Sequence, residues 1–249
     1  MPIAGRVALC VVLCCSAIAA ACSGRVLKPQ YEYEEELYLN LDGSATLNLN
    51  ASVASLVALR GVDLPTDPRA RLDRQQVRRL FADAGSDVTL SLSRRHGRRF
   101  VHVSVQADDV RQLTAIKPFS WSTYMFSRDA DRVDYHQIVG PPRSRAEGSV
   151  AWDGGEIVAF RMHLPSEILF ENSPDKVRRG NILEWEQPLA LRLRGEPLDL
   201  RVQMAPESIL YTTLLLFGST ILVAAAAFAG VLWWVARRGR EPAEAESHP

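Results

Sequence analysis

Residues 31–51 read YEYEEELYLNLDGSATLNLNA, two runs of alternating apolar residues that flank an Asp-Gly pair at positions 42–43. Apolar side chains at every second position predict strands with one buried face, and Asp-Gly between two such runs is typical of a tight hairpin turn. We expect Glu32, Glu34 and Glu36 on the opposite, solvated face, where their like charges would discourage pairing with another chain. The apolar face of the first run consists of Tyr31, Tyr33, Leu37, Leu39 and Leu41.

Short helices and further hairpins are predicted downstream of this hairpin. Residues 52–60 form a short apolar stretch that ends at a glycine, and residues 73–84 form a better helix that Asp73 can cap. Alternating apolar residues predict hairpins at 88–106 and 122–139, with another short helix between them. An antiparallel sheet built from hairpins, with short helices on one face, is the natural packing for this order, so the predicted fold class is α+β.

The chain returns to strands after a glycine-containing loop. Strands are predicted at residues 156–164, 168–172, 181–186 and 198–204. We therefore expect one α+β domain over residues 31–205, which is long enough to bury a hydrophobic core.

A single membrane-spanning helix is predicted at residues 208–236, which contain no charged residue. About 20 apolar residues in a helix cross the hydrocarbon core of a bilayer. The arginines after the span place the short tail, residues 237–249, in the cytoplasm, and the domain on the other side. The residues expected at the membrane interfaces are Tyr211, Trp233, Trp234, Arg237, Arg238 and Arg240.

The N-terminus has the pattern of a secretion signal over residues 1–21, with Arg6 before an apolar core and three alanines before Cys22. A run of small residues that ends in cysteine is similar to a bacterial lipobox, so Cys22 is the predicted lipid-attachment site, followed by a linker over residues 22–30. Ordinary cleavage before Cys22 and an uncleaved leader are the alternatives.

Charge and cysteine usage exclude some classes of protein. The chain has 29 Lys+Arg and 29 Asp+Glu, and nucleic-acid binders usually carry a basic excess, so we expect no nucleic-acid partner. The cysteines are at positions 10, 14, 15 and 22, so the exported domain cannot contain an internal disulfide. A lone free thiol at Cys22 would be a liability in an oxidising compartment, and lipidation removes it.

The sequence contains no convincing catalytic or metal-binding motif. The five histidines lack the spacing of metal ligands, so we expect no metal site and no cofactor. Residues 173–176 match S-x-x-K, but the S-D-N and K-T-G motifs that accompany it in penicillin-recognising enzymes do not occur. We therefore expect a protein that is not an enzyme, and a buried cluster of titratable residues in a cleft would argue against this expectation.

Two features point to binding. Guanidinium groups hold phosphate and carboxylate groups bidentately, so clustered arginines could grip anionic lipid headgroups or cell-wall polymers, although an ordinary solvated surface also explains them. The candidate patch consists of Arg71, Arg74, Arg78, Arg79, Arg94, Arg95, Arg98 and Arg99. Trp121, Trp152 and Trp185 could line a cleft for an acyl chain, and core packing is the alternative.

The last third of the domain carries a resemblance. Leu164-Pro165 at a strand end, Asn172 in the following turn and Asn181-x-Leu183-x-Trp185 before a final strand and a membrane helix resemble the C-terminal pattern of LppM-type envelope lipoproteins of actinobacteria. The resemblance implies an extracytoplasmic α/β domain related to lipid-binding modules. It implies no catalytic residues.

Together these features predict a non-enzymatic binding module of the bacterial cell envelope, anchored in the inner membrane and directed at lipid or at anionic envelope components. The alternative is an interaction subunit of an inner-membrane protein complex. A eukaryotic type I membrane protein is a further alternative, because Asn50-Ala51-Ser52 is a glycosylation sequon, but the lack of disulfides argues against it.

Overall fold

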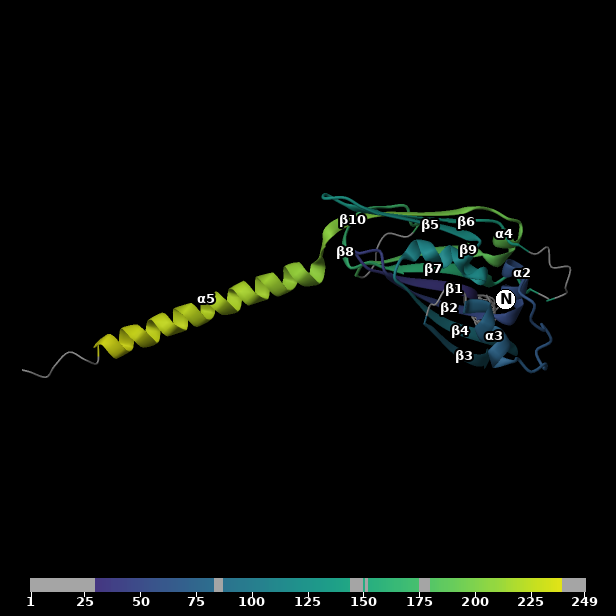
Figure 1. Ribbon diagram of the computed structural model, residues 1–249, viewed down its shortest axis with the longest axis horizontal. Coiled ribbons are helices and arrows are strands. Elements are labelled where there is room, and N and C mark those ends of the chain that lie inside the picture. The colour runs from purple at the N-terminus through teal and green to yellow at the C-terminus, as the bar shows by residue number, and fades with distance from the viewer. Residues whose placement is uncertain (1–29, 83–86, 144–149, 151, 175–179, 239–249) are drawn as a thin grey trace, which may run out of the picture.

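Two β-sheets, several short helices and one long C-terminal helix make up the structure (Figure 1). It is a computed structural model that describes residues 30–82, 87–143, 150, 152–174 and 180–238. The α+β fold class is confirmed. The expected signal peptide, Cys22, Arg240 and part of the S-x-x-K stretch lie outside the described residues, so what we expect of them stays a prediction.

The larger sheet has six strands in the order β3-β4-β2-β1-β7-β9. They are β1 (Gln30–Leu39), β2 (Ala45–Ser52), β3 (Val88–Arg95), β4 (Arg98–Ala107), β7 (Glu156–His163) and β9 (Ile182–Pro188). The first two predicted hairpins are confirmed as β1–β2 and β3–β4, which are joined by pairing of β2 with β4. Strands β1 and β7 pair in parallel, and the other neighbours in this sheet are antiparallel.

The turns of these two hairpins each contain a glycine with a positive φ angle. Gly43, between β1 and β2, has a φ of 88°, and a Cβ added there would lie 2.9 Å from the ring of Phe126. In the β3–β4 turn, His96 has a φ of 48° and Gly97 a φ of 73°. Two successive residues with positive φ are what a two-residue type I′ hairpin turn requires, so the sequence Arg-His-Gly-Arg fixes the register of this hairpin.

The third predicted hairpin belongs to a second sheet, not to the single sheet that the sequence pattern suggested. This sheet has four strands in the order β5-β6-β10-β8. They are β5 (Ser122–Arg128), β6 (Val133–Val139), β8 (Ser166–Glu171) and β10 (Leu198–Ser208). Two 3₁₀ helices, η1 (Val110–Ala115) and η2 (Lys117–Phe119), carry the chain from β4 to β5 and bury apolar side chains on the way, which turns β5 away from the first sheet.

One hydrophobic core joins the two sheets with the short helices α2 (Val53–Arg60), α3 (Arg74–Phe81) and α4 (Leu189–Leu193). The predicted cap of α3 is confirmed, because the Asp73 carboxylate accepts the backbone N–H of Gln75 at 2.8 Å. The helix ends at Phe81, before the expected end at residue 84.

Strand β1 departs from the prediction in its place in the sheet. It is a central strand with partners on both sides, so its charges do not protect an open edge. An irregularity of register between Tyr31 and Tyr33 changes the alternation of the strand, and Glu32 is fully buried. The expectation of a solvated Glu32 is therefore wrong, whereas Glu34 and Glu36 are partly exposed.

The predicted C-terminal helix is confirmed as α5 (Ile209–Arg238), whose length and apolar composition suffice to span a membrane. It follows β10 without a linker. The backbone N–H of Ile209 donates to the carbonyl of Pro165 at 3.1 Å, and Ser208 pairs with Ser166 of β8. These contacts join the start of the helix to the four-stranded sheet.

Candidate functional site

Four arginines line a pocket of about 400 Å³ beside the β3–β4 hairpin. Arg69 and Arg71 come from the segment between α2 and α3, and Arg94 and Arg99 come from β3 and β4. The lining contains no carboxylate among the described residues; its other members are Ala70, Leu72, Leu92 and Ser93. We call this hollow the arginine pocket.

The sheet holds the segment that forms the wall of the arginine pocket. Arg99, only 7% exposed, donates to the carbonyl of Ala70 at 2.7 Å and to the carbonyl of Pro65. Arg94 donates to the carbonyl of Pro68 at 2.9 Å. Both arginines therefore fix the backbone of residues 65–70, which positions the two arginines of that segment.

The side chains of Arg69 and Arg71 are free to meet a ligand. Both are exposed, and neither forms a side-chain hydrogen bond or ion pair with any residue that the structure describes. Burial lowers the pKa of Arg99, the nearby carboxylate of Asp67 opposes that shift, and the charge of Arg94 adds to it. The repulsion between Arg94 and Arg99 shows that positive charge is concentrated here, and a bound anion would relieve it.

The eight arginines of the predicted patch do not form one surface. Arg71, Arg94 and Arg99 meet in the arginine pocket, and the sequence pattern missed Arg69, which joins them. The other five lie outside the pocket. Arg74 donates to the carbonyl of Leu90, and Arg78 and Arg79 are exposed on α3. Arg95 lies 4.2 Å from the ring centroid of Phe100, and Arg98 is ion-paired.

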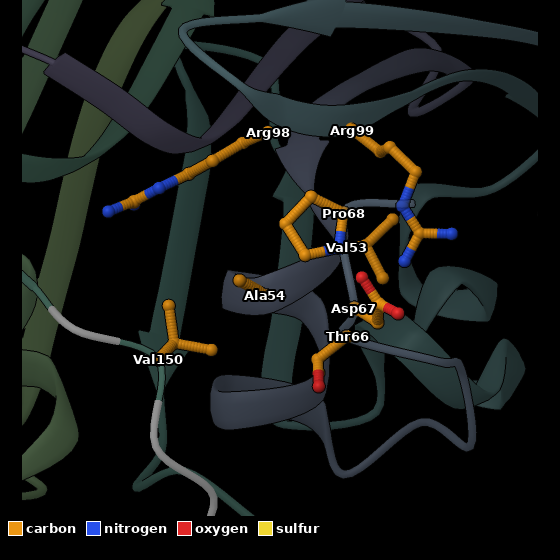
Figure 2. A pocket seen from close by; sticks show the side chains of 8 residues that line it. All are labelled: Val53, Ala54, Thr66, Asp67, Pro68, Arg98, Arg99 and Val150. Carbon is orange, nitrogen blue, oxygen red and sulfur yellow. The ribbon is translucent and has the colours of Figure 1, made fainter. Parts of the chain in front are cut away.

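A second hollow of about 260 Å³ adjoins the arginine pocket and shares Arg99 with it. Figure 2 shows its lining, which comes from the start of α2, the 66–68 segment, β4 and Val150. Its charged members are Asp67, Arg98 and Arg99. The carboxylate of Asp67 makes this hollow less suited to an anion than the arginine pocket.

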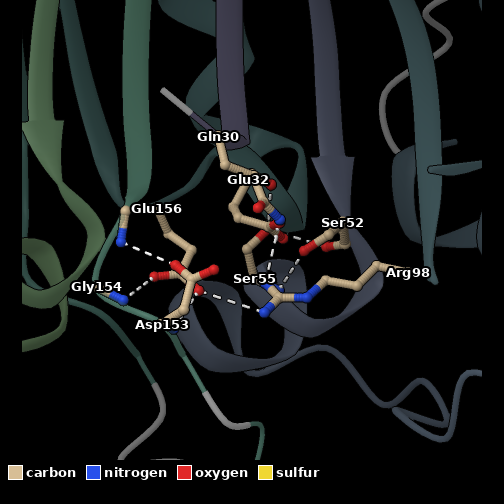
Figure 3. Close-up of polar contacts among 9 residues, drawn as sticks. Gln30, Glu32, Ser52, Ser55, Arg98, Asp153, Gly154 and Glu156 are labelled. Atoms are coloured by element: carbon tan, nitrogen blue, oxygen red, sulfur yellow. Dashed lines mark hydrogen bonds and ion pairs between the residues drawn. The ribbon is translucent and has the colours of Figure 1, made fainter. Parts of the chain in front are cut away.

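Arg98 is held by two buried carboxylates (Figure 3). Its guanidinium lies 2.9 Å from Glu32 and 3.3 Å from Glu156. Glu156 also accepts the backbone N–H groups of Asp153 and Gly154, each at 2.8 Å. The charge of Arg98 therefore neutralises Glu32 and Glu156 at this end of the sheet. This role could not be predicted from its position next to Arg99 in the sequence.

A buried polar cluster between the two sheets was also missed by the sequence pattern. Glu35 is 2% exposed and accepts hydrogen bonds from the Tyr33 hydroxyl, from the Trp121 indole N–H at 3.3 Å and from Gln137 at 3.5 Å. The side chain of Arg60 lies 4.1 Å from the centroid of Trp121. We call this set, completed by Arg192 at 5.0 Å from the same ring, the Glu35 cluster.

Burial dominates the acid–base properties of the Glu35 cluster. Desolvation raises the pKa of Glu35, although the Tyr33 hydroxyl and the charge of Arg60 act in the opposite direction. Desolvation also disfavours the charged form of Arg60, and this lowers its pKa to about 10. Glu35 and its partners line neither of the two hollows described above. The cluster therefore lies inside the core, between the two sheets.

The remaining candidate residues have structural partners. Trp121 and Trp185 are buried in the core, and Trp152 is half-buried with Arg98 at 4.7 Å from its ring centroid. His102, His136 and His163 each contact one polar side chain, and no group of three metal-ligating side chains occurs in the described residues. On α5, Arg237 and Arg238 lie 5.1 and 4.0 Å from the centroids of Trp233 and Trp234, and Tyr211 is exposed in the first turn.

In Figure 1, α3 lies at the end of the domain opposite to the start of α5. The segment that carries Arg69 and Arg71 leads directly into α3. The register of the sheet places Ala45, Ala107 and His163 at the same end, and α5 begins beside Pro165 at that end. Arg94 and Arg99 are at the other end of β3 and β4. At about 3.3 Å per residue, the eight steps from Ala107 to Arg99 correspond to roughly 25 Å.

Comparison with known proteins gives distant structural similarity and no family. No protein-family model matches the chain, and no curated protein matches it. The folded domain of Mycobacterium tuberculosis LppM, solved by NMR, is similar in structure over 73% of this chain and 94% of that domain, with a TM-score of 0.41 and 12% sequence identity. This similarity is too distant to assign the chain to a family, so the LppM-type resemblance stays a prediction.

Proposed function

We propose that this protein is a non-enzymatic, membrane-anchored binding module of the bacterial cell envelope that holds an anionic envelope polymer in the arginine pocket. One observation carries the proposal. Four arginines line one hollow without a carboxylate, and two of them have no side-chain partner among the described residues. Arginine forks bind phosphate and carboxylate groups bidentately, so repeated anionic groups on a polymer are the ligands that such a pocket suits.

The position of the pocket favours a polymer over the headgroups of the membrane that holds α5. The domain separates the pocket from the start of α5 by roughly 25 Å. Electrostatic interactions between exposed charges are largely screened beyond about 8–10 Å at physiological ionic strength. No linker separates the domain from the span, because α5 follows β10 directly and Ile209 is hydrogen-bonded to Pro165. The ligand therefore lies on the side away from the anchoring membrane.

The proposal is tested by polyanion binding to the full chain in nanodiscs of neutral phosphatidylcholine, with inorganic polyphosphate as the probe. Replacing Arg69 and Arg71 by alanine removes two charge-assisted contacts worth about 1.5–3 kcal/mol each, so we expect affinity to fall at least about tenfold. The matched control is Arg78→Ala with Arg79→Ala, which removes the same charge from exposed positions of α3. Equal loss in both double variants would show non-specific attraction and contradict the proposal.

A second candidate function is an interaction subunit of a membrane protein complex. Its support is an apolar patch on β8, the edge strand next to the start of α5, where Leu169 is 54% and Phe170 49% exposed. A partner protein in the membrane could cover this patch. Replacing both residues by glutamate should then abolish co-purification of a stoichiometric partner, and unchanged co-purification would remove this candidate.

A further inference from the structure

The outward face of three adjacent strands, β3, β4 and β2, carries uncharged hydrogen-bonding side chains over most of its length, and it continues with Phe100, Arg95 and Arg98 only at the end with the β3–β4 turn. Charged residues make up 23% of the chain, yet none stands at these nine positions. They are Thr46, Asn48, Asn50, Thr89, Ser91, Ser93, His102, Ser104 and Gln106. A sheet face that only needs to be solvated tolerates lysine, arginine and glutamate equally well, so their absence from this stretch of the face calls for another explanation.

The pairing register aligns these side chains into rows that cross the strands. Thr89, Ser104 and Asn48 form one row, and Ser91, His102 and Asn50 form the next. Neighbouring strands are about 4.8 Å apart, so each row presents hydrogen-bonding groups at regular intervals across the sheet.

A groove of about 210 Å³ runs over these two rows. Asn48, Thr89, Ser91 and Ser104 line it, and their side chains make no hydrogen bond with any other residue in the described part of the chain. Their donors and acceptors face solvent with little side-chain entropy to lose on binding. We call this hollow the neutral groove.

Carboxylates form one wall of the neutral groove and exclude an anionic ligand. Glu34 and Glu36 of β1 line it. Glu34 is paired with Arg161 and Glu36 with His163, so they are fixed acceptors at the border of the groove. Beyond them the exposed ring of Tyr38 is stacked on His163, with 4.1 Å between the ring centroids. An exposed aromatic face beside fixed acceptors and free hydroxyl and amide groups suits a ligand with many hydroxyls and an apolar ring face.

We propose that the neutral groove binds an uncharged glycan chain. Its free amide and hydroxyl groups match the hydroxyls of sugar rings, and its carboxylates accept further sugar hydroxyls. The rows cross three strands, about 10 Å, so the groove contacts a short stretch of such a chain. The groove lies on the outward face of the six-stranded sheet, and the arginine pocket lies at the end of the same sheet. The two sites share no lining residue, so this inference does not depend on the proposed binding of a polyanion.

The test is binding of two fluorescent neutral hexasaccharides, one of β-linked N-acetylglucosamine and one of α-linked glucose, to the full chain in phosphatidylcholine nanodiscs. We expect saturable binding of at least one probe. Asn48→Ala combined with Ser104→Ala should weaken it about tenfold, because two hydrogen bonds of about 0.5–1.5 kcal/mol each are lost. The matched control is Thr123→Ala with Ser127→Ala, which removes two exposed hydroxyls from the four-stranded sheet.

Each outcome decides the inference. Selective weakening in the groove variant supports it, and retention of that binding in the Arg69/Arg71 double variant separates it from the arginine pocket. Binding of neither probe at millimolar concentration overturns it, as does equal affinity in the groove variant and the control. A change of oligomeric state in the groove variant alone, measured by sedimentation, would assign the face to a second copy of the chain and also overturn it.

Discussion

The Glu35 cluster and the arginine pocket are both built around arginines, and they differ in what the guanidinium groups meet. In the core, Arg60 donates to the carbonyl of Pro118 at 2.6 Å and covers Trp121, while Arg192 donates to the carbonyl of Gly140. In the pocket, Arg69 and Arg71 have no such partner among the described residues. A buried arginine that is hydrogen-bonded to backbone carbonyls and packed on an aromatic ring stabilises the fold, whereas one beside a hollow without such partners is available to a ligand.

The largest expected effect tests the structural half of this comparison. Replacing Glu35 by alanine leaves the buried Tyr33 hydroxyl and the Trp121 N–H without their acceptor, at about 1–3 kcal/mol for each group. We expect the free energy of unfolding, measured by urea denaturation, to fall by about 3 kcal/mol. The control Glu167→Ala, at an exposed position of β8, should change it by less than about 0.5 kcal/mol. A similarly small effect at Glu35 would mean that the cluster does not stabilise the core.

The pH dependence of stability sharpens the comparison. Because burial raises the pKa of Glu35 in the folded protein above its ordinary value of 4.5, the folded state binds more protons than the unfolded state between those two values. The stabilisation that the protonation of Glu35 adds to the free energy of unfolding is therefore fully present below pH 4.5 and is lost as pH rises through the pKa of the folded protein. The slope is at most about 1.4 kcal/mol per pH unit.

This dependence is isolated by comparing the wild type with Glu35→Gln, which cannot titrate. The difference in unfolding free energy between the two proteins should change in that window, with the wild type losing stability relative to the variant as pH rises. A constant difference across the window would contradict the raised pKa. The Arg69/Arg71 double variant should keep the wild-type profile, because those exposed groups have no buried titratable partner in the described structure.

The smallest expected effect separates folding from binding at the hairpin that carries Arg94. Gly97 has a φ of 73°, and nothing lies within 4 Å of a Cβ added there, so Gly97→Ala strains only the backbone. We expect a loss of about 1 kcal/mol in thermal or urea unfolding, with unchanged affinity for polyphosphate. Asparagine tolerates this backbone conformation better, so Gly97→Asn should lose less. A loss of affinity in proportion to stability would show that the pocket and the fold are not separable.

The sequence predicted what depends on neighbouring residues. The hairpins around Asp42-Gly43 and His96-Gly97 and the Asp73 cap rest on local turn and capping chemistry, and all three are present. The terminal helix rests on its own apolar composition. The division into two sheets could not be predicted, because it depends on pairing between strands that are distant in the sequence. β10 pairs with β6 in the second sheet, and β1 pairs with β7 in the first across more than a hundred residues. The second pairing also makes β1 a central strand, in which Glu32 is buried.

The roles of the individual arginines could not be predicted from the sequence for the same reason, because they depend on contacts with distant residues. Arg98 and Arg99 are adjacent in sequence, but side chains alternate along a strand, so they leave β4 on opposite faces. One meets Glu32 and Glu156, and the other meets carbonyls of the segment that contains Arg69. Clustering in the sequence correctly indicated positive charge near this hairpin. Which charges stay available depends on contacts made by residues far away along the chain.

Hydroxyl-radical footprinting of the full chain in neutral nanodiscs, with and without polyphosphate, is the most direct test of anion binding in the arginine pocket. Leu72 and Leu92 line the arginine pocket and are half-buried, whereas Trp121 is 6% exposed inside the Glu35 cluster. We expect polyphosphate to protect both leucines from oxidation and to leave the low reactivity of Trp121 unchanged. Unchanged oxidation of the two leucines at saturating polyphosphate would contradict the claim that this pocket is where the protein binds anions.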